Sequence, residues 1–145
     1  MSQILIIGAG PAGLTIAREL KERNISFDQI EKHSDVGGLW DIDNPGTPLY
    51  ETAHFISSKT LSAFPDYPMP ESYPDYPSRK QILNYIKDYA RNFDLYENIQ
   101  FNLFAKKVSQ KSDQTWQVEL SNGEIKNYQK VICATGMQWD PVKPN

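Results

Sequence analysis

Glycines near the start of the chain have the spacing of a loop that could hold a diphosphate. In "ILIIGAGPAGL", residues 4–14, Gly8, Gly10 and Gly13 fit G-x-G-x-x-G directly after an apolar run. In such a loop the first glycine permits a tight turn, the second lets the backbone approach a pyrophosphate, and the third lets a helix pack closely on the strand. The helix start then offers free N–H groups and a partial positive charge to phosphates.

An acidic residue follows this loop at the end of the next predicted strand. Glu31 stands where a carboxylate can accept hydrogen bonds from the hydroxyls of a ribose. Its charge would repel a 2′-phosphate, which disfavours NADP here and leaves FAD or NAD. Gly37 and Gly38 supply a second close approach of the backbone, as a larger dinucleotide carrying an isoalloxazine requires. We therefore predict FAD.

A strand-helix-strand unit must position these residues. The continuous apolar residues 4–7 predict a strand buried on both faces, and a helical stripe follows through 12–23, with Pro11 in the first turn. A second strand is predicted over 25–32, ending near Glu31. Such a unit favours a parallel sheet.

The remaining chain predicts a long loop, a helix and several strands. Five of the ten prolines fall in residues 64–77, which predicts either a long ordered loop or a disordered linker. Ser78 can cap a helix over 79–93. Strands are predicted in the segments that follow, with a hairpin turn at Asn122-Gly123: residues 99–110, 114–120 and 125–136.

Composition limits the class of protein. The chain of 145 residues is 39% hydrophobic with a net charge of −3, which predicts one soluble domain without the clustered Lys and Arg that nucleic acid or acidic membranes need. The only cysteine, Cys133, lies in an apolar run and is expected to be a buried structural thiol. We predict no metal site. We also predict a cytoplasmic location, because no basic segment precedes the short apolar run at the start, as it would in a signal peptide.

The motifs occur in an order that resembles the flavin-containing monooxygenases. The resemblance covers nearly the whole chain through "GAGPAGL", E-x5-"GGLW", "FPDYPMP" and "ICATG". It implies an α/β, Rossmann-like FAD-binding domain over residues 1–145, with a central parallel sheet and an added antiparallel hairpin or meander. The chain is expected to be the N-terminal portion of a longer fold. The family's second G-x-G-x-x-G, which binds NADPH in an NADPH-binding domain, is absent from this sequence.

The resemblance also implies a function. FAD is reduced by NADPH, molecular oxygen is captured as a flavin C4a-hydroperoxide, and oxygen passes to a small-molecule soft nucleophile such as an amine or sulfide. We also predict a homodimer. The residues implied to bind the cofactor comprise the glycine loop, the ribose carboxylate, the flavin-side wall, the adenine strand and the "ATG" segment: Gly8, Ala9, Gly10, Pro11, Ala12, Gly13, Glu31, Lys32, Gly38, Leu39, Trp40, Ile56, Ser57, Val108, Ala134, Thr135 and Gly136.

One position departs from the family pattern. Where the family has an asparagine whose amide lies near the flavin, this chain has Ile56, which cannot donate a hydrogen bond. The catalytic residues are therefore unassigned, with Ser57 and His54 as candidates. Two alternatives stay open: a related reductase or oxidase without oxygen transfer, and a non-catalytic FAD-binding remnant. His33 and Lys59 are expected to face solvent.

Overall fold

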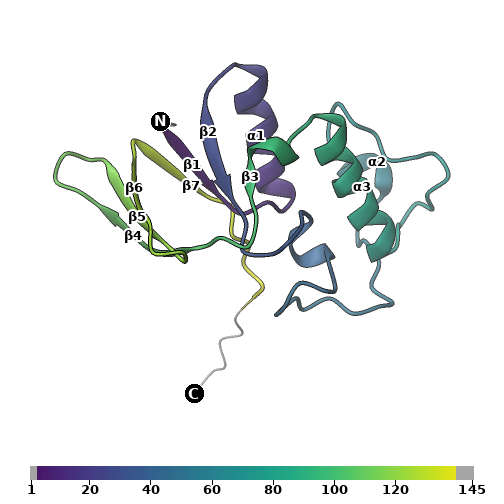
Figure 1. The fold of residues 1–145 in the computed structure, drawn as a ribbon. Coiled ribbons are helices and arrows are strands. Elements are labelled where there is room, and N and C mark those ends of the chain that lie inside the picture. The colour runs from purple at the N-terminus through teal and green to yellow at the C-terminus, as the bar shows by residue number, and fades with distance from the viewer. Residues whose placement is uncertain (1–2, 140–145) are drawn as a thin grey trace.

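The computed structural model describes residues 3–139, which form two sheets with helices packed beside the larger one (Figure 1). The larger sheet has the strand order β3-β2-β1-β7 and is parallel throughout. Its strands are β1 (Ile4–Ile7), β2 (Phe27–Ile30), β3 (Ile99–Gln100) and β7 (Lys130–Cys133). The expected strand-helix-strand unit is confirmed, with α1 (Pro11–Glu22) between β1 and β2.

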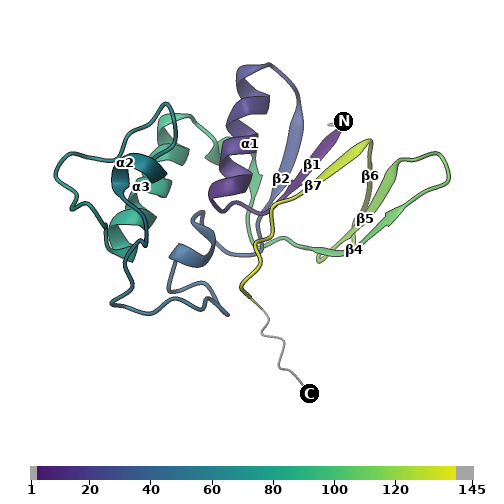
Figure 2. The same cartoon turned by 180° about the vertical axis from the view of Figure 1, so that it is seen from behind.

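The second sheet is a three-stranded antiparallel meander beside the first, as Figure 2 shows from behind. Its strands are β4 (Ala105–Gln110), β5 (Trp116–Leu120) and β6 (Ile125–Tyr128). The hairpin predicted at Asn122-Gly123 joins β5 to β6, and Gly123 has a φ of +89°. The predicted class, an α/β fold with a parallel sheet and an added antiparallel meander, is confirmed.

Two long strands predicted from the sequence are each divided between the sheets. The segment 99–110 breaks into β3 and β4, and the segment 125–136 breaks into β6 and β7. The second break is at Gln129, because the amides of Gln129 and Lys130 both donate to the Gln3 carbonyl and turn the chain into the parallel sheet. The chain therefore changes sheets twice within runs of good strand formers.

The helix predicted after Ser78 is α3 (Arg79–Asn92). Ser78 accepts from the Gln81 amide while the Gln81 side chain accepts from the Ser78 amide, which is a capping box. The buried face of the helix includes Ile82, Ile86 and Tyr89, which belong to the main core. Near the "GGLW" segment a short 3-10 turn, η1 (Gly38–Trp40), packs against α3.

The proline-rich segment is an ordered loop packed on α3. Phe64 lies 4.1 Å from Tyr89 between ring centroids, and the Tyr85 hydroxyl accepts from the Phe64 amide at 2.7 Å and donates to the Tyr67 carbonyl. Lys59, in the short helix α2 (Lys59–Ser62), was expected to face solvent, but its Nζ donates to the carbonyls of Glu71 and Tyr73 within this loop. The alternative of a disordered linker is wrong.

The expectation of a buried thiol is also wrong, because Cys133 is exposed. It ends β7, the edge strand of the parallel sheet, at the level where the chain leaves the sheet. None of the helices within residues 3–139 is long and apolar enough to cross a membrane.

Candidate functional site

A cavity of about 760 Å³ opens at the carboxyl ends of the parallel strands. Ile7, Ile30 and Cys133, the last residues of β1, β2 and β7, lie in register and all line it. In the sheet, β2 is the neighbour of β1 on one side and β7 is its neighbour on the other. The cavity therefore lies where the strand order reverses. Ligands of open α/β sheets bind at this place, and the volume is typical of such sites.

The glycine loop forms the floor of the cavity. Gly8 has a φ of +110°, and a Cβ on Gly8 would lie 2.4 Å from the Ala134 carbonyl oxygen. A Cβ on Gly13 would lie 2.1 Å from the Gly8 carbonyl oxygen. Both positions therefore exclude any side chain, as the spacing predicts. Gly10 is the N-cap of α1, and no side chain within residues 3–139 caps that helix, so its first N–H groups are available to an anion.

Glu31 lies beside this loop in a buried position. Its carboxylate accepts from the Ala9 amide at 2.6 Å and from the His33 amide at 2.8 Å, and the residue is 8% exposed. A carboxylate offers about four lone-pair positions, so two amide donors leave room for ribose hydroxyls. Glu31 also lines the cavity, where its charge can meet a ligand.

The wall next to the loop is made by η1 and the turn that follows it. The Gly37 amide donates to the Ala9 carbonyl at 3.1 Å, which ties this wall to the glycine loop. Asn44 braces the wall, since its side-chain amide donates to the Gly38 carbonyl at 3.2 Å. Trp40 packs edge-on to Phe55 at 5.2 Å between ring centroids. The wall is thus fixed by contacts on both sides.

A charged network fastens the same segment to α3. Lys87 Nζ lies 2.8 Å from an Asp35 oxygen and 3.6 Å from an Asp41 oxygen, and the Tyr96 hydroxyl donates to Asp35 at 2.9 Å. Burial alone would raise the pKa of Asp35, but hydrogen bonds from Lys87, the Val36 amide and Tyr96 hold that pKa below its ordinary value of 3.8. Burial likewise opposes the charge of Lys87, but Asp35 and Asp41 keep the pKa of Lys87 above 10.5.

His33 belongs to this network and does not face solvent. Its side chain is 12% exposed, and its Nε2 lies 3.5 Å from an oxygen of Asp41. The expectation of a solvent-facing side chain is therefore wrong. The residues after β2 turn inward toward α3, which the strand pattern alone did not indicate.

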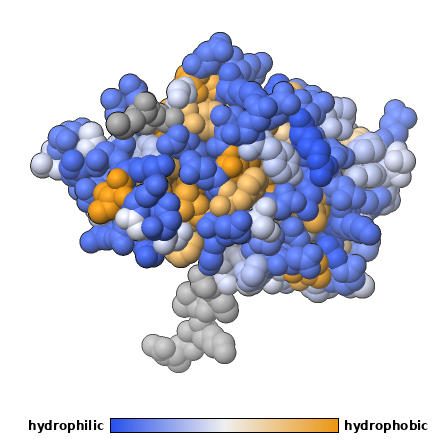
Figure 3. Space-filling model, in the orientation of Figure 1, coloured by the Kyte–Doolittle hydropathy of each residue, from blue (hydrophilic) through white to orange (hydrophobic). Residues whose placement is uncertain are grey.

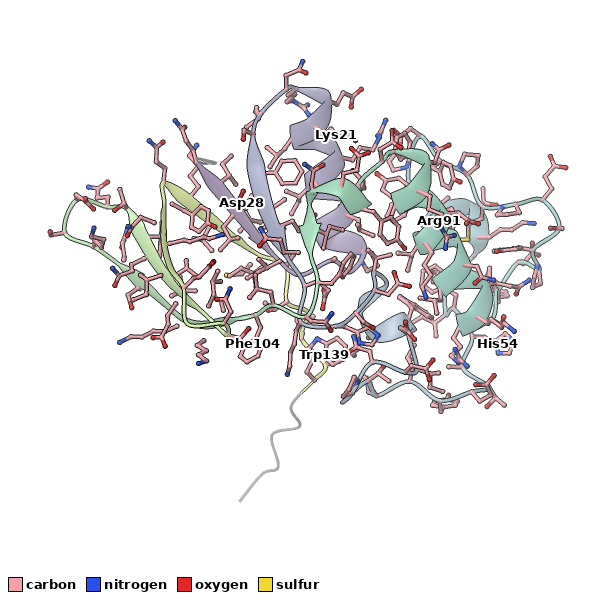
Figure 4. The ribbon with its side chains drawn as sticks, viewed as in Figure 1. Lys21, Asp28, His54, Arg91, Phe104 and Trp139 are labelled. Atoms are coloured by element: carbon pink, nitrogen blue, oxygen red, sulfur yellow. The ribbon has the colours of Figure 1, made fainter. Side chains whose placement is uncertain are left out.

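A second wall of the cavity, separate from the η1 wall, carries a lysine and an aromatic ring. Lys32 Nζ lies 5.8 Å from the centroid of the Phe104 ring, and Leu103 and Ala105 line the cavity beside that ring. At the far side Trp139 donates from its indole to the Thr135 carbonyl at 2.7 Å. Figure 4 places Phe104 and Trp139 along the rim below the strands. Apolar side chains gather in the middle of the face shown in Figure 3, within a mostly hydrophilic surface.

The structure brings most of the predicted site residues to this cavity. The predicted residues that line it are Gly8, Gly10, Pro11, Ala12, Glu31, Lys32, Gly38, Leu39, Trp40, Ala134, Thr135 and Gly136. Ala9 and Gly13 belong to the same loop but are buried and do not line the cavity. Cys133 also lines the cavity, at a position that was expected to be core.

Four predicted residues lie elsewhere. Val108 is within β4 and packs against the smaller core cluster, so Leu103–Ala105 take the place at the cavity that was expected for it. Ile56 is 96% exposed and Ser57 contacts Ser62, and neither lines the cavity. His54 forms a short β-bridge with Ser78 directly before α3, and Figure 4 shows it away from Phe104 and Trp139.

Several lining residues were not predicted. They are Ile7, Ile30, Asn44, Pro45, Gly46, Leu103, Phe104, Ala105, Cys133, Met137 and Trp139. Asn44-Pro45-Gly46 is a turn sequence directly after the "GGLW" motif, which is a signal that could have placed it beside η1. No local sequence pattern predicts that Phe104 and Trp139 line the cavity. They lie in two segments far apart in the chain, which only the fold brings to the same rim.

The fold is a Rossmann-like α/β fold with a cavity at the carboxyl edge of its parallel sheet. Sequence comparison then gives the family: the profile described as FMO-like, flavin-binding monooxygenase-like, matches residues 1–142. The chain belongs to this family. It is similar to human flavin-containing monooxygenase 1, at 31% identity over 98% of the chain, and to mouse flavin-containing monooxygenase 5, also at 31% over 98%. The chain spans only 29% of the length of these relatives.

Solved structures share the fold. A flavin-containing monooxygenase from Stenotrophomonas maltophilia matches 100% of this chain and 42% of its own with a TM-score of 0.82 at 25% identity. The S-allyl-L-cysteine S-oxygenase of Allium sativum matches 92% of this chain and 36% of its own with a TM-score of 0.81 at 23% identity.

Proposed function

We propose that this chain is the FAD-binding part of an NADPH-consuming, flavin-dependent monooxygenase. The observation that carries the proposal is the meeting of three features in one cavity: the uncapped start of α1 behind the glycine loop, the buried carboxylate of Glu31, and the backbone contact between Gly10 and Gly38. A diphosphate, a ribose and a flat ring system each find a matching surface there.

Each part of FAD would be held by a different set of residues. The N–H groups at the start of α1 would bind the diphosphate, and Glu31 would accept from the ribose hydroxyls. Lys32, Phe104 and the neighbouring backbone would enclose the adenine end. The flavin end would lie toward Leu39 and Trp40, where η1 and the 44–46 turn would shield one side of it from water.

Bound FAD would supply the redox chemistry, which is acceptance of a hydride and reaction with molecular oxygen. The residues of this chain would orient the cofactor and keep one face dry. A solved steroid monooxygenase similar to this chain is described as bound to NADP, and another relative as a complex with FAD and NADP, which supports both cofactors for the whole protein. Small soft nucleophiles, such as amines or sulfides, are the proposed substrates.

A related FAD/NAD(P)H-dependent reductase or oxidase without oxygen transfer is the second candidate function. Ile56, at the family's asparagine position, has no side-chain donor, and it is 96% exposed and lies outside the cavity. In the whole protein, an oxidase or reductase would consume NADPH without transferring oxygen to an amine or sulfide. Product analysis with a tertiary amine and a sulfide separates the two functions. The cytoplasmic location and the homodimer remain predictions from the sequence.

Titration with FAD tests the proposed binding site. We expect saturable quenching of flavin fluorescence with FAD and much weaker binding of FMN, which lacks the adenosine and one phosphate. Glu31→Gln should weaken FAD binding by about tenfold, the equivalent of one hydrogen bond to a charged group. Glu119→Gln, an exposed change on β5, is the matched control and should leave the affinity unchanged. Equal affinity for FAD in the Glu31 variant would refute the site.

A further inference from the structure

The peptide between Gly8 and Ala9 is held at both of its edges by side chains from one short stretch of chain. The Gln29 side-chain amide donates to the Gly8 carbonyl at 2.8 Å, and the Glu31 carboxylate accepts from the Ala9 N–H at 2.6 Å. That carbonyl and that N–H belong to a single planar peptide unit. The two side chains therefore act on one rigid group from opposite edges, and together they fix its orientation.

Alternation along β2 produces this arrangement. Residues two apart in an extended chain present their side chains to the same face, and Gln29 and Glu31 are two apart, at the end of β2 and directly after it. Gln29 lies opposite Ile6 in the register of the parallel sheet, one pair before the sheet's carboxyl edge. The Ile30 carbonyl, between the two, accepts from the Gly8 amide at 2.8 Å. Three successive residues thus hold the start of the glycine loop.

Packing alone does not account for a glutamine at this position. Gln29 is 0% exposed in a strand whose neighbours Phe27 and Ile30 are buried and apolar. A buried amide costs free energy wherever its hydrogen bonds are incomplete, and Gln29 Oε1 has no partner within residues 3–139. Leucine or methionine would fill similar volume without that cost. The bond from Gln29 Nε2 to Gly8 is therefore the feature of the site that needs an amide.

The orientation of this peptide sets the geometry of the loop. Gly8 has a φ of +110°, in a region that only glycine enters freely, so its backbone is intrinsically free to rotate. If the peptide flipped, its carbonyl oxygen would face the Glu31 carboxylate and its N–H would face the Gln29 amide. The contact with Glu31 would then be repulsive, and Gln29 could bond the flipped peptide only after its own amide turned to present Oε1. The carbonyl of the next peptide, that of Ala9, accepts from the Gly37 amide, so the clamped peptide adjoins the one that links the loop to the η1 wall.

We propose that Gln29 is a positioning residue for the diphosphate of the bound dinucleotide, acting through the Gly8–Ala9 peptide that it clamps together with Glu31. The proposal rests on the proposed dinucleotide function for its ligand. The clamp itself is a property of the ligand-free chain. Gln29 would not touch a ligand in the cavity, since it is buried behind the loop and does not line the cavity.

The test compares Gln29→Met with a substitution at an equally buried residue that does not contact the Gly8–Ala9 peptide. Gln29→Met keeps the length of the side chain and removes the donor. Ile6→Val, on the adjacent strand and also 0% exposed, loses core packing without touching the Gly8 carbonyl. Hydrogen exchange of the Ala9 amide in the ligand-free chain reports the clamp, and binding of FAD and ADP reports the diphosphate site.

In Gln29→Met we expect faster exchange at the Ala9 amide and about tenfold weaker binding of both FAD and ADP, the equivalent of one hydrogen bond. Ile6→Val should change neither beyond its effect on global stability, measured by urea unfolding. A Gln29→Glu variant supplies a donor only when its carboxyl is protonated. Its dissociation constant for FAD, divided by that of wild type at each pH, should fall as the pH is lowered.

The outcomes separate the two proposals. If wild type binds neither FAD nor ADP, the dinucleotide function fails, and the role of Gln29 toward a diphosphate fails with it, while exchange at Ala9 still decides whether the peptide is clamped. If wild type binds both and Gln29→Met matches Ile6→Val in affinity and in exchange at Ala9, the positioning role is refuted and the dinucleotide function stands.

Discussion

Gly10 and Gly38 touch backbone to backbone across the floor of the cavity. A Cβ built on Gly38 would lie 3.1 Å from the Gly10 Cα, and one built on Gly10 would lie 3.5 Å from the Gly38 Cα. The contact joins the start of α1 to η1, two segments that the sequence separates by β2. A side chain on Gly38 would therefore push the η1 wall away from the glycine loop.

We predict that Gly38→Ala weakens FAD binding beyond its effect on stability. Gly38 has a φ of +59°, so alanine there costs about 1 kcal/mol of backbone strain in addition to the close contact. Gly123→Ala is the matched control, because Gly123 has a φ of +89° but nothing within 4 Å of its Cβ position. Urea unfolding should show a loss in both variants, and fluorescence titration should show weaker FAD binding only in Gly38→Ala. Unchanged FAD affinity in that variant would mean that the wall does not contact the ligand.

The network around Lys87 gives a prediction about stability and pH. Lys87→Met removes the cation that faces Asp35 and the buried Asp41, and should lower the free energy of unfolding by about 1–3 kcal/mol at neutral pH. Lys80→Met, an exposed change on the same helix, should have little effect. Urea unfolding of both variants measures the difference.

The same variant has an expected pH window. The pKa of Asp35 is lowered in the folded state, so its contribution to stability is present above 3.8 and is lost as the pH falls through the folded value. The pKa of Lys87 is raised, so its contribution is present below 10.5 and is lost as the pH rises through the folded value. The advantage of wild type over Lys87→Met should shrink in strong acid and in strong alkali. A constant difference at every pH would contradict the assignment to this ion pair.

Tyr85 carries a prediction about the proline-rich loop. Its hydroxyl bonds the Phe64 amide and the Tyr67 carbonyl, so Tyr85→Phe should destabilise the chain by about 1–2 kcal/mol and expose residues 64–77 to proteolysis. Burial raises the pKa of Tyr85 to about 12. The bond that the hydroxyl donates to the Tyr67 carbonyl is therefore intact below pH 10.0 and is lost as the pH rises through about 12, whereas the phenolate can still accept from the Phe64 amide. Tyr76→Phe, at a side chain that is 56% exposed, serves as the control.

Local signals predicted the parts of this structure that depend on neighbours in sequence. The capping box at Ser78, the glycine loop and the hairpin at Gly123 each follow from a few adjacent residues, and each is present. The breaks at 101–104 and Gln129 were missed because both sides of each break contain strand-forming residues. Which sheet a strand joins depends on distant partners, such as the Gln3 carbonyl at Gln129.

The site followed the same rule. Glu31 was predicted to bind a ribose from its distance to the glycines, but Gln29, two residues earlier, was overlooked although a glutamine among apolar strand residues indicates a specific partner. Val108 was expected near the cavity by resemblance, whereas the register of β4 against β5 places it in the smaller core. Phe104 comes to the rim instead, because the chain crosses between the sheets just before β4.

Cys133 provides an independent measure of ligand binding, because it is the only cysteine in the chain, is exposed and lines the cavity. We predict that a small alkylating reagent labels it readily in the ligand-free folded chain and that FAD slows the labelling. Protection should follow occupancy, with labelling about tenfold slower when free FAD is ten times its dissociation constant. In Glu31→Gln the same protection should require a higher FAD concentration. Glutathione labelled in parallel shows whether FAD affects the reagent itself. Because the thiol ends β7 beside the "ATG" segment, labelling that is independent of saturating FAD would place the cofactor away from the carboxyl edge of the sheet.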